Sequence, residues 1–166
     1  MRVFAMAAAA LTLTLGVAAC GGSGKSSTSN QTLQRDADTL AIDQIERTWH
    51  KAASTKNVDL MMTIWAPDAT FNLGTETLHG KAQIRGFFTH KAGPFQPQNH
   101  WVSDTPAYKI RVTVNGDKGT LYFECDYIDV KTQKVAAVVG ADQNVQKIDG
   151  KWLITSAAAA TPTLGP

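Results

Sequence analysis

The sequence predicts an α+β domain in which three N-terminal helices pack on a strongly bent antiparallel sheet that forms a cone. Apolar residues recur at helical spacing up to about residue 90, and from Asn99 onward they alternate as in strands. A set of helices followed by a long antiparallel run is typical of the α+β class. A bent sheet around one long helix leaves a cone with an open end, so we expect a small-molecule pocket there.

The predicted domain covers residues 36–160, and its first element is a helix. This helix starts at Ala37 and ends near Lys56 or Asn57, after about five turns. Its apolar positions are Leu40, Ile42, Ile45, Trp49, Ala52 and Ala53.

Two more helices and one short strand follow. The second helix covers residues 58–65, and Pro67 stops it because proline cannot continue a helix. Residues 69–74 alternate like a strand. Residues 81–90 form the third helix, which buries Ile84, Phe87 and Phe88.

The second half is predicted to be strands only. A short strand opens at Asn99 to Val102, and longer strands cover residues 107–114, 119–129, 134–148 and 152–159. The turn Asn115 to Lys118 sets the register of the first long pair. The expected core pairs are Val112 with Leu121, Ile110 with Phe123, and Tyr108 with Cys125.

The opposite face of this pair is polar. Lys109 lies opposite Glu124 there, and Arg111 is diagonal to Glu124. Such a face, which also includes Asp126, faces solvent or another subunit, so a homodimer through the outer sheet face is one expected partnership.

The first residues are predicted to direct the chain out of the cytoplasm. Residues 1–19 have one cation, Arg2, before an apolar stretch too short for a membrane span, which is typical of a signal peptide. The ending Val17-Ala18-Ala19-Cys20 resembles the bacterial lipobox, which implies that Cys20 is lipidated. Residues 20–35 are then a flexible tether and residues 161–166 a C-terminal tail. The alternative is an ordinary secretory signal with Cys20 as a bystander.

This prediction implies a location in the cell envelope. The lipid on Cys20 would hold the protein on the outer membrane facing the periplasm, or on the outer face of the cytoplasmic membrane.

Composition argues against several partner classes. The net charge of +2, with no run of basic residues between aromatics, does not fit nucleic-acid binding. The four histidines lack metal-ligand spacing, and no glycine-rich phosphate loop follows a strand. We therefore expect neither a metal nor a nucleotide cofactor.

Two stretches, Ile45 to Gly74 and Leu78 to Phe88, resemble the SnoaL-like branch of the nuclear-transport-factor-2-like (cystatin-like) superfamily. The resemblance covers the whole domain and implies its fold. It does not imply one reaction, because the superfamily includes isomerases, cyclases, dehydratases, transport factors and members with no known activity.

A comparison with the ketosteroid isomerase pattern of this superfamily argues against proton transfer by that mechanism. The resemblance puts Trp49 where those enzymes carry an oxyanion-binding tyrosine and Leu73 where they carry the carboxylate base. A leucine cannot remove a proton. Asp142 falls near their protonated aspartic acid, but the alternation of its strand aims it away from the core.

The catalytic residues stay unknown, with three candidates. His100 could act as acid or base, because many SnoaL-like relatives resemble this chain in carrying a histidine that points into the cone. Asp126 and Asp142 are its candidate partners. The residues expected to line the pocket are Trp49, Trp65, Phe71, Leu73, Phe87, Phe88, His100, Trp101 and Tyr108.

Three functions remain open at this point. The first is binding of a small hydrophobic molecule or a partner protein in the apolar cone, without catalysis. The second is an enzyme of the isomerase, cyclase or dehydratase type that uses His100 as acid-base. The third is a dimerising interaction module of an envelope complex. The alkyl side chain of Leu73 favours the first and the third.

Overall fold

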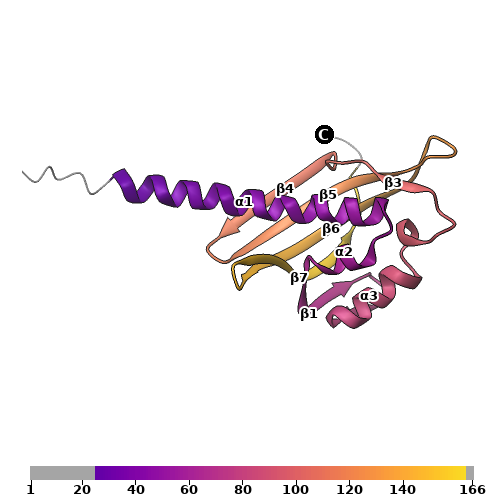
Figure 1. The fold of residues 1–166 in the computed structure, drawn as a ribbon, viewed down its shortest axis with the longest axis horizontal. Helices are drawn as coiled ribbons and strands as arrows, with labels where there is room; N and C mark the ends of the chain where they lie inside the picture. Colours follow the sequence, from indigo (N-terminus) through magenta and orange to yellow (C-terminus); the bar gives the residue numbers. More distant parts are fainter. Residues whose placement is uncertain (1–24, 164–166) are drawn as a thin grey trace, which may run out of the picture.

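The computed structural model describes residues 25–163 and confirms the α+β class (Figure 1). Helices pack on a strongly curved, unclosed sheet. The elements are α1 (Lys25–Ser54), α2 (Val58–Met62), β1 (Trp65–Asn72), β2 (Thr77–His79), α3 (Gly80–His90), the 3-10 turn η1 (Gly93–Phe95), β3 (Trp101–Ser103), β4 (Lys109–Asn115), β5 (Lys118–Asp129), β6 (Lys134–Ile148) and β7 (Lys151–Ala160).

The sheet is mixed, whereas the sequence predicts an antiparallel one. Its strands follow the order β2-β1-β7-β6-β5-β3, and β4 pairs with β5 next to β3. The first strand, β1, lies beside the last strand, β7, and runs parallel to it. Two strands can pair in parallel only when a long connection separates them in the chain, and here α3 and five strands lie between them.

The first helix is longer than predicted. It begins at Lys25, so residues 25–35 are helical where a flexible tether was expected. The physical reason is that the glycines end at Gly24 and no glycine or proline interrupts the helix as far as Ser54. In Figure 1 the first turns of α1 extend beyond the sheet. The predicted signal peptide and Cys20 lie outside the described residues.

The second helix ends earlier than predicted. It stops at Met62, and β1 already starts at Trp65, so Pro67 does not end a helix. Proline cannot donate to a sheet ladder, and Pro67 lies where the register between β1 and β7 shifts, between Trp65 and Thr70. The irregularity of β1 therefore coincides with the proline, which has no backbone N–H to donate.

The predicted register of the β4–β5 hairpin is confirmed for its central pairs. Ile110 lies opposite Phe123, and Val112 lies opposite Leu121. The expected pair of Tyr108 with Cys125 is wrong, because β4 begins only at Lys109. The Tyr108 side chain is exposed, and its hydroxyl donates to Glu124 Oε2 (2.9 Å) on the outer face.

The outer face is less solvated at Glu124 than predicted. The Glu124 side chain is fully buried, and it accepts hydrogen bonds from the hydroxyls of Tyr108 and Tyr122. Thr163 donates to it from its backbone nitrogen (3.0 Å) and its hydroxyl (2.9 Å). Lys109 Nζ lies 3.0 Å from Glu124 Oε1. The C-terminal segment therefore covers this carboxylate, and a ring of donors replaces its water.

The core lies between α1 and the inner face of the sheet. Five aromatic side chains meet there with ring centroids 5.4 to 6.2 Å apart: Trp49, Trp65, Phe71, Phe88 and Phe123. Two buried polar side chains lie next to them on α1, where His50 Nδ1 is 2.7 Å from Glu46 Oε1. The same oxygen accepts a hydrogen bond from the backbone nitrogen of Ala107 (2.7 Å), which ties α1 to the segment before β4.

Candidate functional site

An apolar cavity of about 390 Å³ lies between the helices and the inner face of the sheet. It is formed by α1, α3, η1, β3 and the inner faces of β1, β5, β6 and β7. The lining residues are Trp49, Phe71, Leu73, Phe87, Phe88, Ala92, Gly93, Pro94, Phe95, Trp101, Tyr127, Ala137, Val139, Gly140, Ala141 and Ala159. This cavity is the apolar pocket that the bent sheet predicts.

The space exists because large side chains on the helical side face small ones on the sheet. On β6, the inner positions within the cavity are Ala137, Val139 and Ala141, and none reaches far from the backbone. On the other side the rings of Phe88 and Phe95 lie 5.1 Å apart, so they support one another. Alanines on the sheet thus leave a volume that the rings surround without filling.

One glycine is required where the cavity wall bends toward β3. A Cβ atom on Gly93 would come within 2.7 Å of a ring carbon of Trp101. That distance is too short for any side chain. Gly93 therefore lets the Trp101 ring lie directly against the backbone and close this part of the wall.

The cavity lining contains almost no side-chain group that could transfer a proton. No aspartate, glutamate, histidine or lysine belongs to its lining among residues 25–163, and the one titratable group is the hydroxyl of Tyr127. Burial raises the pKa of Tyr127 far above its ordinary value, so this hydroxyl is neutral at physiological pH. It can hydrogen-bond to a ligand but cannot act as a base.

Of the residues predicted to line the pocket, Trp49, Phe71, Leu73, Phe87, Phe88 and Trp101 do so. Trp65, His100 and Tyr108 do not. Trp65 is fully buried behind the wall, with its ring 5.4 Å from that of Phe71. Tyr108 lies on the other side of the sheet because it precedes the regular part of β4.

The three catalytic candidates do not meet. His100 is exposed just before β3, and its side chain makes no hydrogen bond with any residue that the structure describes. Its backbone oxygen accepts a hydrogen bond from the backbone nitrogen of Val130, just past the end of β5. Asp142 lies opposite Tyr122, eight residues before Val130, so the two side chains are far outside hydrogen-bond range of each other. The expectation that His100 points into the cone is wrong, because the chain has not yet entered the sheet there.

Asp126 and Asp142 both lie on the outer face of the sheet. Asp126 alternates with the buried residues Cys125 and Tyr127, and its Oδ1 is buried without a hydrogen bond from residues 25–163. Asp142 is exposed, as its strand alternation predicts. Neither carboxylate belongs to the apolar cavity.

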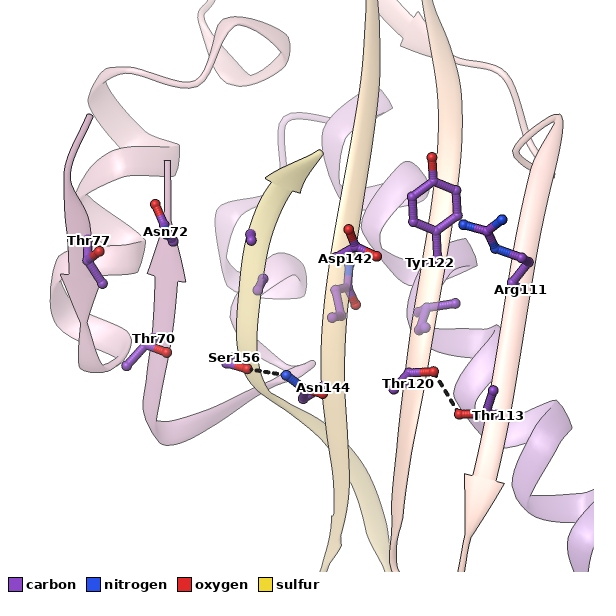
Figure 2. Close-up of a pocket in the computed structure, with 14 residues that line it drawn as sticks. Thr70, Asn72, Thr77, Arg111, Thr113, Thr120, Tyr122, Asp142, Asn144 and Ser156 are labelled. Carbon is purple, nitrogen blue, oxygen red and sulfur yellow. Dashed lines mark hydrogen bonds between the residues drawn. The ribbon is translucent and has the colours of Figure 1, made fainter. Parts of the chain in front are cut away.

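A second, polar hollow of about 630 Å³ lies on this outer face (Figure 2). Its floor is β7, whose outward residues Ser156 and Ala158 are small. The Arg111 guanidinium lies over the Tyr122 ring, 4.2 Å from its centroid. Several of its polar groups pair with one another, as Asn144 Nδ2 does with the Ser156 hydroxyl (2.8 Å). The polar residues are therefore separated from the apolar cavity by the sheet.

Sequence reasoning missed several lining residues. Tyr127 is the only polar side chain among them, and its alternation with Phe123 and Cys125 on β5 would have identified it as inward-facing. Ala137, Val139 and Ala141 follow the same alternation on β6. Phe95 and its neighbours in η1 come from a loop, for which no periodicity exists.

Comparison with known proteins agrees with this architecture. A family model described as "SnoaL-like domain" matches residues 34–158. The chain belongs to this SnoaL-like family. No curated protein is similar enough to the chain to count as a relative.

Solved structures similar to this SnoaL-like domain include an NTF2-like protein with a cystatin-like fold from Novosphingobium aromaticivorans, at 17% identity and a TM-score of 0.70. That match covers 87% of this chain and 94% of the other. A candidate aromatic ring hydroxylase from the same organism has 23% identity and a TM-score of 0.61, covering 79% and 92%. A candidate dehydratase of the NTF2-like family from Streptomyces avermitilis has 13% identity and a TM-score of 0.60, covering 76% and 99%. At these identities the likeness shows the fold alone.

None of the helices in residues 25–163 is long and apolar enough to cross a membrane. Within the same residues, no three His, Cys, Asp or Glu side chains lie close enough together to hold a metal ion.

Proposed function

We propose that this SnoaL-like domain binds a small, neutral, apolar molecule in the cavity between its helices and its sheet, without converting it. The observation that carries the proposal is the lining itself. It combines aromatic and aliphatic side chains with a single neutral hydroxyl, that of Tyr127. A mostly apolar cavity with a few polar groups is typical of small-molecule sites.

The lining also supports a neutral ligand over a charged one. Moving a charged group from water into such a cavity is unfavourable unless a partner compensates for the lost hydration. The lining offers no charged side chain for this purpose. Apolar surface, in contrast, gains about 25 cal/mol for each Å² removed from water. One hydrogen-bonding group on the ligand could contact Tyr127.

The absence of turnover rests on the position of Leu73. Where the ketosteroid isomerase pattern carries its base, this chain has an alkyl side chain on the cavity wall. His100, the other candidate base, is exposed outside the lining. The similar solved structures described as a candidate hydroxylase and a candidate dehydratase share the fold, and no reaction is transferred from them.

Binding is testable with N-phenyl-1-naphthylamine, a neutral probe whose fluorescence rises in apolar surroundings. We expect saturable binding to the chain that starts at residue 20 and carries Cys20→Ser. Ala137→Trp should abolish binding, because it fills the cavity from β6. The matched control is Ala136→Trp, which adds the same side chain at the neighbouring, exposed position. Equal binding by both variants would refute the proposed site.

We also propose that the domain is exported and anchored by a lipid on Cys20. The support is the sequence Val17-Ala18-Ala19-Cys20 after an apolar stretch. Globomycin, which blocks lipoprotein signal peptidase, should make an acylated precursor accumulate. A Cys20→Ala protein that remains in the membrane fraction would contradict the anchor.

A second candidate function, self-association through the outer sheet face, is favoured by one observation. Val102, Ile128 and Val135 form a row across β3, β5 and β6. Val102 is 36% exposed and Val135 is 55% exposed. Sedimentation velocity should then show a dimer that Val135→Lys dissociates. A monomer at all concentrations tested would exclude this interface.

A further inference from the structure

Lys56 makes an unusual set of contacts next to the cavity. Its ammonium donates to the backbone oxygens of Pro94 (2.9 Å), Gln96 (3.0 Å) and Asn99 (2.6 Å). A lysine ammonium has three donors, and all three are used here. No carboxylate among residues 25–163 lies in ion-pair range of Lys56, so backbone carbonyls alone compensate its charge.

These three oxygens belong to one short stretch, residues 92–99, which we call the wall segment. It connects α3 to β3 and contributes Ala92, Gly93, Pro94 and Phe95 to the cavity lining. The segment also has internal bonds, from Asn99 Nδ2 to the Gly93 oxygen (2.9 Å) and from Gln96 Nε2 to the Ala92 oxygen (3.1 Å). Lys56 joins this small unit to the end of α1.

The backbone of Lys56 indicates that its side chain is needed at this position. Its φ is +55°, in the left-handed region that favours glycine. The hydrogen bonds Lys56 N to Ala53 O and Asn57 N to Ala52 O close α1 in the pattern whose left-handed position glycine usually occupies. A lysine there is strained, and the three hydrogen bonds of its ammonium offset the strain.

We infer that Lys56 is a positioning residue that holds the wall segment against the cavity and thereby sets the rate at which a ligand enters and leaves. The part of this inference that concerns ligand entry and exit rests on the proposed function. An enclosed ligand leaves when part of the wall opens locally. Removing three hydrogen bonds to one wall favours the opened state, and the effect falls mainly on the dissociation rate.

Two variants separate this role from a purely structural one. Lys56→Met keeps the aliphatic stem and removes the donors. Lys56→Gly also removes the donors, but it relieves the left-handed strain, so the fold should keep its unfolding midpoint. The matched control is Lys51→Met, which changes an exposed lysine in the last turn of α1 that donates no side-chain hydrogen bond to the described part of the chain.

The test has two readouts on the chain that starts at residue 20. Stopped-flow displacement of N-phenyl-1-naphthylamine should show dissociation about tenfold faster in both Lys56 variants and unchanged in Lys51→Met. Amide hydrogen exchange at Gln96 and Asn99 should be faster in the same two variants. Unchanged dissociation would overturn the inference for the ligand. Unchanged exchange at both amides would overturn the stabilisation of the wall segment by Lys56, which we call the clamp.

The second readout also distinguishes this inference from the proposed function. If the wild-type chain binds no probe, the proposed function fails. Faster exchange at Gln96 and Asn99 in the Lys56 variants would then still support the clamp, and unchanged exchange would overturn both.

Discussion

Asp38 on α1 connects the first helix to the far end of the sheet. Its Oδ1 accepts hydrogen bonds from Lys147 Nζ on β6 (2.7 Å) and from Trp152 Nε1 on β7 (2.9 Å). Gln34 Nε2 donates to Oδ2 (3.0 Å). The hydrogen bond from Lys147 has the largest effect on this carboxyl. Together with those from Gln34 and Trp152, it lowers the pKa of Asp38 from 3.8 to about 2. The change Asp38→Asn removes the charge while keeping the size of the side chain.

The expected loss follows from the pKa. A lowering from 3.8 to about 2 corresponds to about 2 kcal/mol of preference for the ionised carboxylate in the folded state. Because the Lys147 side chain is 31% exposed, solvent screening reduces this, and we expect about 1 to 2 kcal/mol. The midpoint of thermal unfolding should fall by about 3 to 8 °C.

The pH dependence has a definite sign. The folded-state pKa is lowered, so the contribution is fully present above pH 4 and is lost as the pH falls toward 2. Urea unfolding followed by tryptophan fluorescence should show the wild type more stable than Asp38→Asn at pH 7, and the two nearly equal near pH 2. The control is Asp36→Asn, at an exposed carboxylate of the same helix. Equal stability at pH 7, or a difference that persists at pH 2, would refute this account of Asp38.

Three further predictions concern the core and the site. Phe88→Ala should reduce the free energy of unfolding by about 3 to 5 kcal/mol in urea denaturation, because the ring packs on Trp49 and Phe95, and a loss below 1 kcal/mol would contradict that packing. Burial raises the pKa of the Cys125 thiol to about 12, so Ellman's reagent should react with it only after unfolding; rapid reaction of the native protein would be inconsistent with the fold. His100→Ala should leave the affinity for N-phenyl-1-naphthylamine unchanged in a fluorescence titration, and a large loss would mean that His100 contacts the ligand after all.

Strong local patterns account for what the sequence predicted correctly. The third helix was predicted over residues 81–90 and is observed over Gly80–His90. The agreement follows from a clear apolar stripe in its sequence. The β4–β5 register follows from a short turn between two alternating strands. Leu73 and Phe71 were assigned to the cavity wall for the same reason, since they share one side of a strand.

Residues outside regular elements account for the errors. Tyr108 and His100 each stand just before a strand, where alternation does not yet apply, and both side chains are exposed. Glu124 was expected on a face open to solvent or to another subunit, but a segment some forty residues later covers it through Thr163. Contacts between residues so far apart in the sequence depend on the path of the folded chain, and no local sequence pattern predicts that path.

The sequence alone determined the class of the domain, most of its strands and the apolar character of its pocket, because periodicity and side-chain size act over a few neighbouring residues. Only the tertiary structure decided which groups share the cavity. It brought Phe95 into the lining, left His100 outside it, and joined Lys56 to the backbone oxygens of Pro94, Gln96 and Asn99. Such meetings depend on the curvature of the sheet and on the path of its loops, and these are set by packing across the whole domain.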